Sequence, residues 1–454
     1  MAHMTLDSAI AVNRFGLGAA PGERAGVGAD PRAWLAKQAG QPAPAYPEFG
    51  KLAHSSEALK EYPRWIASLR TAGARTVEET FRAHFGPIML EEFGARLAAA
   101  AATPAPFHER LVWFWANHFT VSAEKPLVFA LVGSFEREAI RPQVTGRYAN
   151  LLLAAARHPA MIFYLDNHLS VRKGWLPRQP SRSAAFPSPT GLNENLAREI
   201  LELHTLGVNG GYTQADVTEF ARVLTGWTVR AQGSPGFLFD PARHEPGSRT
   251  LLGRTYAQDG MAQGEAVLRD LAAHPATALH VATKLARHFI ADEPPPGAVA
   301  RIASAFRDTD GDLPSVYAAL LDCPEAWERP LAKLKTPIEY VVSCLRAIPA
   351  SRAAKPQALF FALRGMGQRP FFASSPQGWA DTAQDWAGAD ALWKRIEWAG
   401  ILAARLGSQV DPLALAREGY GAALGEATRL SVARAESRQQ GLALWLASPE
   451  FQRR

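Results

Sequence analysis

The chain has 454 residues, of which 47% are hydrophobic and 20% are charged, a composition that is ordinary for a globular protein with a large apolar core. The formal net charge of +6 is small for this length and no Lys/Arg-rich run stands out, which argues against nucleic-acid binding. No uninterrupted apolar stretch reaches the about 18 residues needed to cross a membrane, so we expect a soluble protein without a membrane span.

Apolar residues recur at the three- and four-residue spacing of helices along most of the chain. The predicted helices cover residues 54–71, 76–101, 106–119, 126–140, 146–157, 193–207, 213–226, 262–273, 276–291, 297–307, 312–322, 336–347 and 388–405. Thr213 and Asp216 have the spacing of a capping box, Gly207 marks a helix end, and Pro337 suits a first helical turn. The pattern therefore predicts a mainly α fold.

Strand patterns are rare. The stretches 236–240 and 249–253 flank a loop rich in Pro, Gly and His, and together they predict one small β-hairpin near 236–253. We expect a main helical domain over residues 5–330 that contains this hairpin, and a C-terminal helical subdomain over 331–454, unless both form one domain. The Pro- and Ser-rich stretch 171–190 predicts a long loop, which is either a binding loop or a disordered insertion.

The segment from Gly191 to Thr205 is dense in polar side chains. On a helical wheel Glu194, Arg198 and Glu199 share the polar face, while His204 falls on the apolar face near Asn193. Ion pairs between neighbouring turns explain this face without any function, and this is the favoured interpretation when the helix is considered alone. Alternatively the face is the wall of a cleft, where Glu194 or Glu199 serves as an acid and Arg198 and Asn193 bind an anion.

The segment 108–119 is apolar on nearly every side but contains Asn117 and His118, so these polar groups must be paired or functional if the helix is buried. His118 is the predicted general base or acid, with Asn117 as a binding residue. His204 is either a hydrogen-bonded core histidine or a second site residue.

Four further residues are candidates for substrate binding. Asp166 and Asn167 end a short apolar run, Trp227 follows the helix predicted over 213–226, and His244 lies in the loop of the predicted hairpin. Each also has a purely structural interpretation, a helix end for the first two and an exposed loop for His244.

The metal and nucleophile motifs are absent. No HExxH, GxxxxGK[ST], GxSxG or CxxC occurs, and Cys323 and Cys344 lie in apolar helical surroundings typical of buried, inert thiols. Glu202 and His204 are two residues apart and diverge on a helix, so a metal would need ligands from several segments, for example His118, Glu199 and His244. We therefore predict no metal ligands, although a bound metal stays an alternative.

Several of these stretches resemble a known family. They are Asn13-Arg14-Phe15-Gly16, WANHF at 115–119, YLDN at 164–167, GLNENLAREILELHTLGVNGGYTQADVTEFARVLTGW at 191–227, His244 with the following LLG, and Thr283-Lys284-Leu285. The chain is similar to the bacterial "domain of unknown function 1800" family over nearly its whole length. The resemblance implies a helical bacterial protein, often an exported one, whose gene neighbours that of an uncharacterised exported sulfatase-like family. It supplies no catalytic residues.

Three functions stay open. The first is an enzyme, a lyase or hydrolase, that uses His, Glu and Arg acid–base chemistry on a polar substrate, such as an anion or a polysaccharide. The second is a non-catalytic accessory protein that binds the sulfatase-like exported partner, and the third is a metal-dependent enzyme. Residues 1–3 resemble a cloning remnant and no secretion leader follows Met4, so we expect a cytoplasmic protein, or a periplasmic one if a leader was trimmed.

Overall fold

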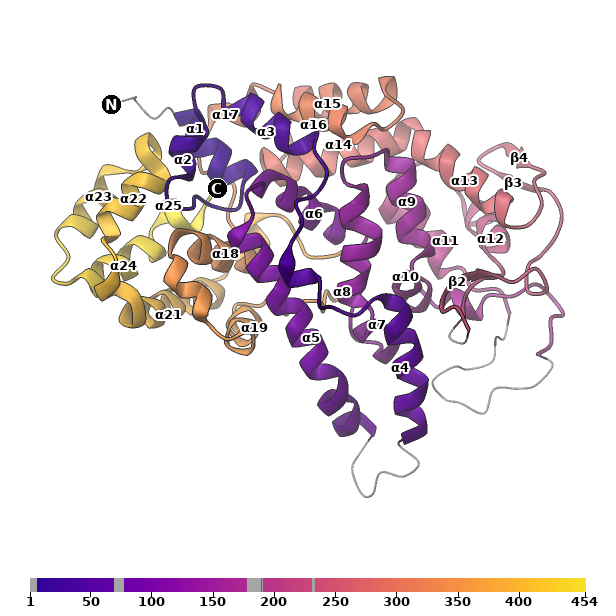
Figure 1. Ribbon diagram of the computed structural model, residues 1–454. Coiled ribbons are helices and arrows are strands. Elements are labelled where there is room, and N and C mark those ends of the chain that lie inside the picture. Colours follow the sequence, from indigo (N-terminus) through magenta and orange to yellow (C-terminus); the bar gives the residue numbers. More distant parts are fainter. Residues whose placement is uncertain (1–5, 69–76, 178–188, 190, 231–232) are drawn as a thin grey trace.

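The computed structural model describes residues 6–68, 77–177, 189, 191–230 and 233–454. Within them the chain forms helices α1 to α25, several short 3-10 and π-helical turns, and four short strands, so the mainly α prediction is confirmed (Figure 1). The other residues, including most of the predicted loop 171–190, lie outside the described part.

The N-terminal helices are α1 (Leu6–Ile10) with the π-helix η1 (Ala11–Phe15), α2 (Glu23–Gly26), α3 (Pro31–Ala39), α4 (Ser55–Ser68), α5 (Val77–Ala102) and α6 (Pro106–His118). α4 and α5 project from the body side by side, joined by ring contacts such as Trp65 to Phe81 at 5.2 Å between centroids (Figure 1). α6 is buried along almost its whole length, as its apolar sequence predicts.

The central elements follow in chain order. They are α7 (Pro126–Phe129), α8 (Val132–Phe135), η3 (Glu136–Ile140), α9 (Tyr148–Arg157), α10 (Pro159–Tyr164), α11 (Asn195–Glu199), the π-helix η6 (Ile200–Thr205), α12 (Gln214–Val223), α13 (Met261–Ala273), α14 (Pro275–Phe289), α15 (Pro296–Asp308), α16 (Leu313–Leu321) and α17 (Glu325–Glu328). Thr213 and Asp216 form the predicted capping box, and Gly207, with φ of +82°, ends the helix formed by α11 and η6.

The C-terminal helices gather at one end of the molecule, opposite the strands (Figure 1). They are α18 (Pro337–Ala347), α19 (Pro356–Gly365), α20 (Ala383–Trp386), α21 (Ala389–Leu406), α22 (Pro412–Tyr420), α23 (Glu426–Ala433), α24 (Arg438–Ala447) and α25 (Pro449–Gln452). α18 begins at Pro337 as predicted, behind a capping box of Thr336 and Glu339. A continuous cluster of buried apolar residues runs from Ile10 to Phe451. No described helix is long and apolar enough to cross a lipid bilayer.

The predicted hairpin between 236–240 and 249–253 is wrong. β2 (Gly236–Phe239) pairs with β1 (Trp227–Arg230), and β3 (Arg249–Leu251) pairs with β4 (Arg254–Tyr256), which makes two separate antiparallel pairs. Between β3 and β4 stand only Leu252 and Gly253, both with positive φ. A two-residue turn of this kind connects adjacent strands directly, so β3 folds back on the residues that follow it.

Candidate functional site

A cavity of about 640 Å³ lies between α6 and α14. Its other walls include α18, residues 202–208, side chains of α5, α8 and η3, and a stretch of residues 368–385 that we call the covering segment. Val208, which is exposed, belongs to the lining, so the cavity reaches the protein surface there. This volume is in the range of small-molecule sites.

The two helices present matching stripes of side chains at four-residue spacing. The stripes are Arg110, Phe114 and His118 on α6, and His280, Lys284 and His288 on α14. They run antiparallel: Arg110 Nη1 lies 3.4 Å from His288 Nε2, whereas the rings of His118 and His280 lie 6.1 Å apart at the other end. The cavity therefore has a guanidinium end and an imidazole end, with Lys284 between them.

Backbone carbonyls of η6 set the tautomers of two cavity histidines. His118 Nε2 lies 3.1 Å from the carbonyl oxygen of His204, and His280 Nε2 lies 3.0 Å from that of Leu203. Because a carbonyl only accepts, both Nε2 atoms donate and both Nδ1 atoms carry the lone pair. These carbonyls are available because the last carbonyls of a helix have no partner within it. Tyr148 also donates its hydroxyl to the His204 carbonyl.

His118 combines burial with an unused acceptor. The residue is 1% exposed, and its Nδ1 has no hydrogen-bond partner among the described residues. Burial, followed by the nearby charge of Lys284, lowers the pKa of His118 well below its ordinary value. Burial and the Lys284 charge also lower the pKa of His280, to about 4. Both imidazoles are therefore neutral at physiological pH.

Lys284 stands in the cavity without a counter-ion. Its ammonium group makes no hydrogen bond or ion pair with any described residue, whereas Lys333 and Lys335, which precede α18 in the chain, are hydrogen-bonded. Burial lowers the pKa of Lys284 to about 8; the Asp381 charge opposes this shift and the Arg287 charge adds to it. Arg287 also lines the cavity without a carboxylate partner in the described chain, and its Nε donates only to the Asp292 carbonyl at 3.3 Å.

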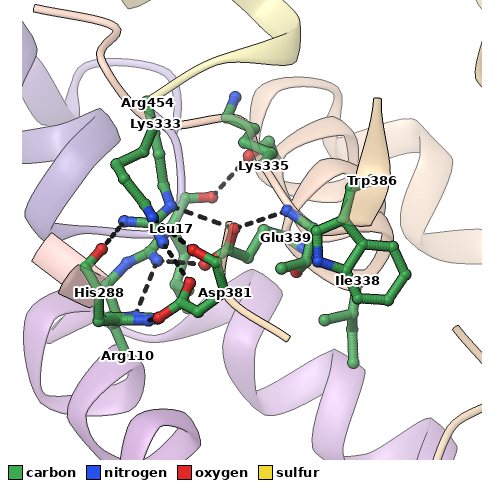
Figure 2. A network of polar contacts seen from close by, with 12 residues as sticks. Leu17, Arg110, His288, Lys333, Lys335, Ile338, Glu339, Asp381, Trp386 and Arg454 are labelled. Atoms are coloured by element: carbon green, nitrogen blue, oxygen red, sulfur yellow. Dashed lines mark hydrogen bonds and ion pairs between the residues drawn. The ribbon is translucent and has the colours of Figure 1, made fainter. Parts of the chain in front are cut away.

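The guanidinium end rests on a buried charge network, shown in Figure 2. Glu339, which is 4% exposed, receives hydrogen bonds from Arg110 and, at 3.1 Å, from Arg454 Nε. Burial raises the pKa of Glu339, but the two guanidinium charges outweigh burial and hold it far below its ordinary value. Asp381 accepts from His288 Nδ1 at 2.6 Å, which leaves His288 Nε2 as an acceptor facing Arg110.

The acidic residues of the lining already have partners. Glu136 pairs with Arg96 and Arg141, Asp292 with Lys333, Glu339 with Arg110 and Arg454, and Asp381 with His288 and Arg454; Glu202 accepts from the Tyr212 hydroxyl and Asp385 from that of Thr382. Within the described lining, Lys284 and Arg287 are thus the cations without a carboxylate partner, while Glu202 and Asp385 are hydrogen-bonded only to hydroxyl groups.

Asn117 attaches the covering segment to α6. Its side-chain nitrogen donates to the Trp379 carbonyl at 2.8 Å, and its side-chain oxygen accepts from the Trp379 amide at 2.8 Å. Gly378 has φ of +83°, and a Cβ there would lie 2.5 Å from the Asn117 carbonyl oxygen. The amide clamp and the glycine let the covering segment pass close over the end of α6.

The structure brings only some of the predicted site residues to the cavity. Asn117 and His118 line it, whereas Asn193, Glu194, Arg198 and Glu199 do not. Glu194 pairs with Arg198 at 3.2 Å and accepts from Gln214 and Thr218 on α12. Burial and the charge of Glu202 raise the pKa of Glu199, and the Arg198 charge opposes them. The 193–199 side chains therefore lie outside the cavity that Asn117 and His118 line.

The remaining predicted residues make structural contacts near the strands or in the core. Asn167 donates to the carbonyls of Leu224 and Trp227, at 3.1 and 2.8 Å, and the Trp227 side chain is fully buried. Asp166 pairs with Lys125 at 2.7 Å.

The two remaining predicted histidines also take part in backbone contacts. His244 Nδ1 lies 3.0 Å from the Thr225 carbonyl. His204 is buried, and its backbone carbonyl, not its ring, accepts the hydrogen bond from His118.

Metal ligation has no support within the described residues. No group of three or more His, Cys, Asp or Glu side chains there is arranged to hold an ion. Both cysteines are free and buried, as expected, and burial raises the pKa of each thiol.

Sequence reasoning missed most of the cavity. One signal was present in the sequence. The segment HVATKLARH places basic side chains at every fourth residue of a predicted helix, namely His280, Lys284 and His288. Asp381 and the covering segment carry no periodic signal, and their position follows only from the packing of the C-terminal helices.

Together these features define a helical protein with a polar, partly cationic cavity between two antiparallel helices. Residues 10–453 match the model of the family described as "Protein of unknown function (DUF1800)", and the chain belongs to this family. No match to the chain was found among the curated proteins or among the solved structures.

Proposed function

We propose that the protein is an enzyme, a lyase or hydrolase, that binds a small polar anion in the α6–α14 cavity and uses His118 as its acid–base group. The observation that carries the proposal is Lys284, a cation that lines the cavity without a carboxylate partner in the described chain. Beside it stands His118, whose Nδ1 lone pair is equally unpartnered.

The case for an anionic substrate is electrostatic. A half-buried ammonium group without a counter-ion is unfavourable, and a bound carboxylate would compensate it. None of the acids of the described lining forms an ion pair with Lys284 or Arg287, and Glu339 and Asp381 are already held by Arg110, Arg454 and His288. A ligand that brings its own negative charge is therefore the natural partner of Lys284 and Arg287.

The case for acid–base chemistry rests on His118. In the empty cavity its pKa is depressed by burial and by the charge of Lys284. An anion bound at Lys284 would neutralise the second cause and raise the pKa toward the range useful for proton transfer. In a lyase, His118 would remove a proton from the carbon next to the substrate carboxylate. In a hydrolase, it would take a proton from a bound water instead. One uronic acid unit of a glycan has the size and charge that this cavity suits.

Binding of D-glucuronate and D-glucose, compared by calorimetry, tests the proposal, because the two sugars differ at one carboxylate. A charge-assisted contact contributes about 1.5–3 kcal/mol, so glucuronate is expected to bind about tenfold or more tightly than glucose. Lys284→Met should markedly reduce this difference, whereas Lys394→Met, which removes an exposed lysine paired with Glu397, should not. The affinity for glucuronate should fall as pH rises through about 8, where Lys284 loses its charge.

Equal affinity for the two sugars, or a preference that is unchanged in Lys284→Met, would contradict the anionic site. Preference that persists unchanged above pH 8 would also contradict it.

A further inference from the structure

We propose that Lys284 is a nucleophilic amine that forms an imine with the carbonyl carbon of a small anionic aldehyde or oxo acid bound in the α6–α14 cavity. This inference rests on the proposed function, which it deepens by naming the chemical class of the ligand. It concerns the same cavity but makes a separate demand on Lys284: a bond to carbon in place of an ion pair.

The first argument compares three lysines with limited access to solvent. Lys333 donates to Asp292 and to the Asp381 carbonyl, and Lys335 donates to the Phe451 carbonyl at 2.9 Å and to the Tyr420 hydroxyl at 3.2 Å. Both therefore hold separate chain segments together. Lys284 makes no such contact with the described residues and faces a cavity of about 640 Å³. A carbonyl compound in the cavity could therefore reach this amine.

The second argument is the surroundings of Lys284. Phe114 and Trp379 line the same cavity, and the nearby imidazoles of His118 and His280 are neutral. Burial here lowers the pKa of Lys284 to about 8, so a useful fraction of the amine is unprotonated near neutral pH. An exposed lysine with an ordinary pKa near 10.5 has almost none.

The chemical step is balanced by groups that are present. The Lys284 Nζ lone pair attacks the carbonyl carbon, and the carbonyl oxygen takes up a proton to give a carbinolamine. The nitrogen releases both of its protons, one as the carbinolamine forms and one as water is lost, and the hydroxyl leaves with a proton as water, so amine plus carbonyl becomes imine plus water without oxidation or reduction. His118 Nδ1, which has a free lone pair, is suited to carry the proton from nitrogen to oxygen.

The anionic part of the ligand would lie toward Arg287. This guanidinium is three residues beyond Lys284 on α14, lines the cavity and has no carboxylate partner among the described residues. A guanidinium binds a carboxylate with two parallel hydrogen bonds. A carboxylate close to the carbonyl carbon, as in glyoxylate, would engage both groups at once.

Trapping with glyoxylate and sodium cyanoborohydride, followed by peptide mass spectrometry of the full-length protein, tests the inference. The reductant converts an imine into a stable secondary amine on the modified lysine. Because the lowered pKa makes the unprotonated fraction of Lys284 on the order of a hundredfold larger than that of an exposed lysine, at least about tenfold more label is expected on Lys284 than on Lys394 near neutral pH.

Two variants separate this inference from the proposed function. Lys284→Arg keeps the positive charge but has no nucleophilic amine, so it is expected to retain preference for glucuronate over glucose while trapping at position 284 is lost. His118→Gln removes the lone-pair nitrogen and is expected to slow trapping at Lys284 without moving label to other lysines. Lys335, which faces no comparable space, serves as the internal control for a buried lysine.

The outcomes are distinct. Label spread over exposed lysines, with none preferred at Lys284, overturns the imine proposal even if glucuronate binding still depends on Lys284. Loss of charge-dependent binding together with selective trapping of Lys284 would overturn the anionic site and keep the reactive amine.

Discussion

Two regions of the molecule carry dense polar side chains, and they differ in what surrounds the charges. The surface cluster on α11, residues 193–199, has Glu194 and Arg198 paired with each other and with α12 side chains, and both are about a third exposed. In the α6–α14 cavity the charges are withdrawn from water, and Lys284 has no partner in the described chain. The sequence points to the first region because it is dense in charged residues. The second region is the better candidate for a functional site because its charges are buried.

The largest effect that separates the two regions is expected for Glu339→Gln. This substitution leaves Arg110 and Arg454 without their shared carboxylate inside the protein, and breaking a buried charge pair costs about 3–5 kcal/mol. Urea denaturation of the variant measures the change in the free energy of unfolding. The matched variant Glu194→Gln in the surface cluster should lose less than about 1 kcal/mol. Similar losses in both variants would remove the distinction between the regions.

Asn117→Ala should have an intermediate effect. The alanine cannot hold the Trp379 peptide, which loses a donor and an acceptor at the edge of the cavity. The expected loss of stability is about 1–3 kcal/mol, measured by thermal or urea unfolding. Asn150→Ala, at an exposed position of α9, provides the control and should stay within about 0.5 kcal/mol of the parent. A loss no greater than that control would mean that the covering segment does not depend on Asn117.

The smallest effect is expected for Arg198→Ala. Its ion pair with Glu194 is exposed to solvent, and pairs of this kind contribute about 0.3–0.5 kcal/mol. A double-mutant cycle with Glu194→Gln measures this coupling, and glucuronate affinity should not change in either variant. A coupling of several kcal/mol, or a loss of glucuronate binding, would restore the 193–199 side chains as candidates for the functional site.

Local sequence predicted most of the longer helices well because their causes are local, although it missed α19 and α22 to α25 and gave one helix over 126–140 where the structure has α7, α8 and η3. The helix predicted over 106–119 corresponds to α6, Pro106–His118, and the helix predicted over 276–291 corresponds to α14, Pro275–Phe289. Capping boxes and helix-ending residues lie within a turn of the boundary that they set. The single predicted hairpin failed because strand partners depend on the turn between them, and the two-residue turn at Leu252 and Gly253 pairs β3 with β4.

The candidate site divides in the same way. Burial of His118 and Asn117 followed from the apolar helix around them, so these two cavity residues were predictable. Lys284 lies in the same cavity because α14 packs antiparallel against α6. Lys284 is more than 150 positions further along the chain than His118. The role of Asn117 depended on the covering segment, which comes from residues 368–385.

Sequence by itself determined that this protein is helical, where many of its longer helices begin and end, and that a histidine and an asparagine would be buried on one of them. Tertiary structure alone decided which charges are neutralised by neighbours and which is left facing a cavity. The physical reason is range: helix formation and capping act within a few residues, whereas desolvation and ion pairing depend on every segment that packs against a side chain.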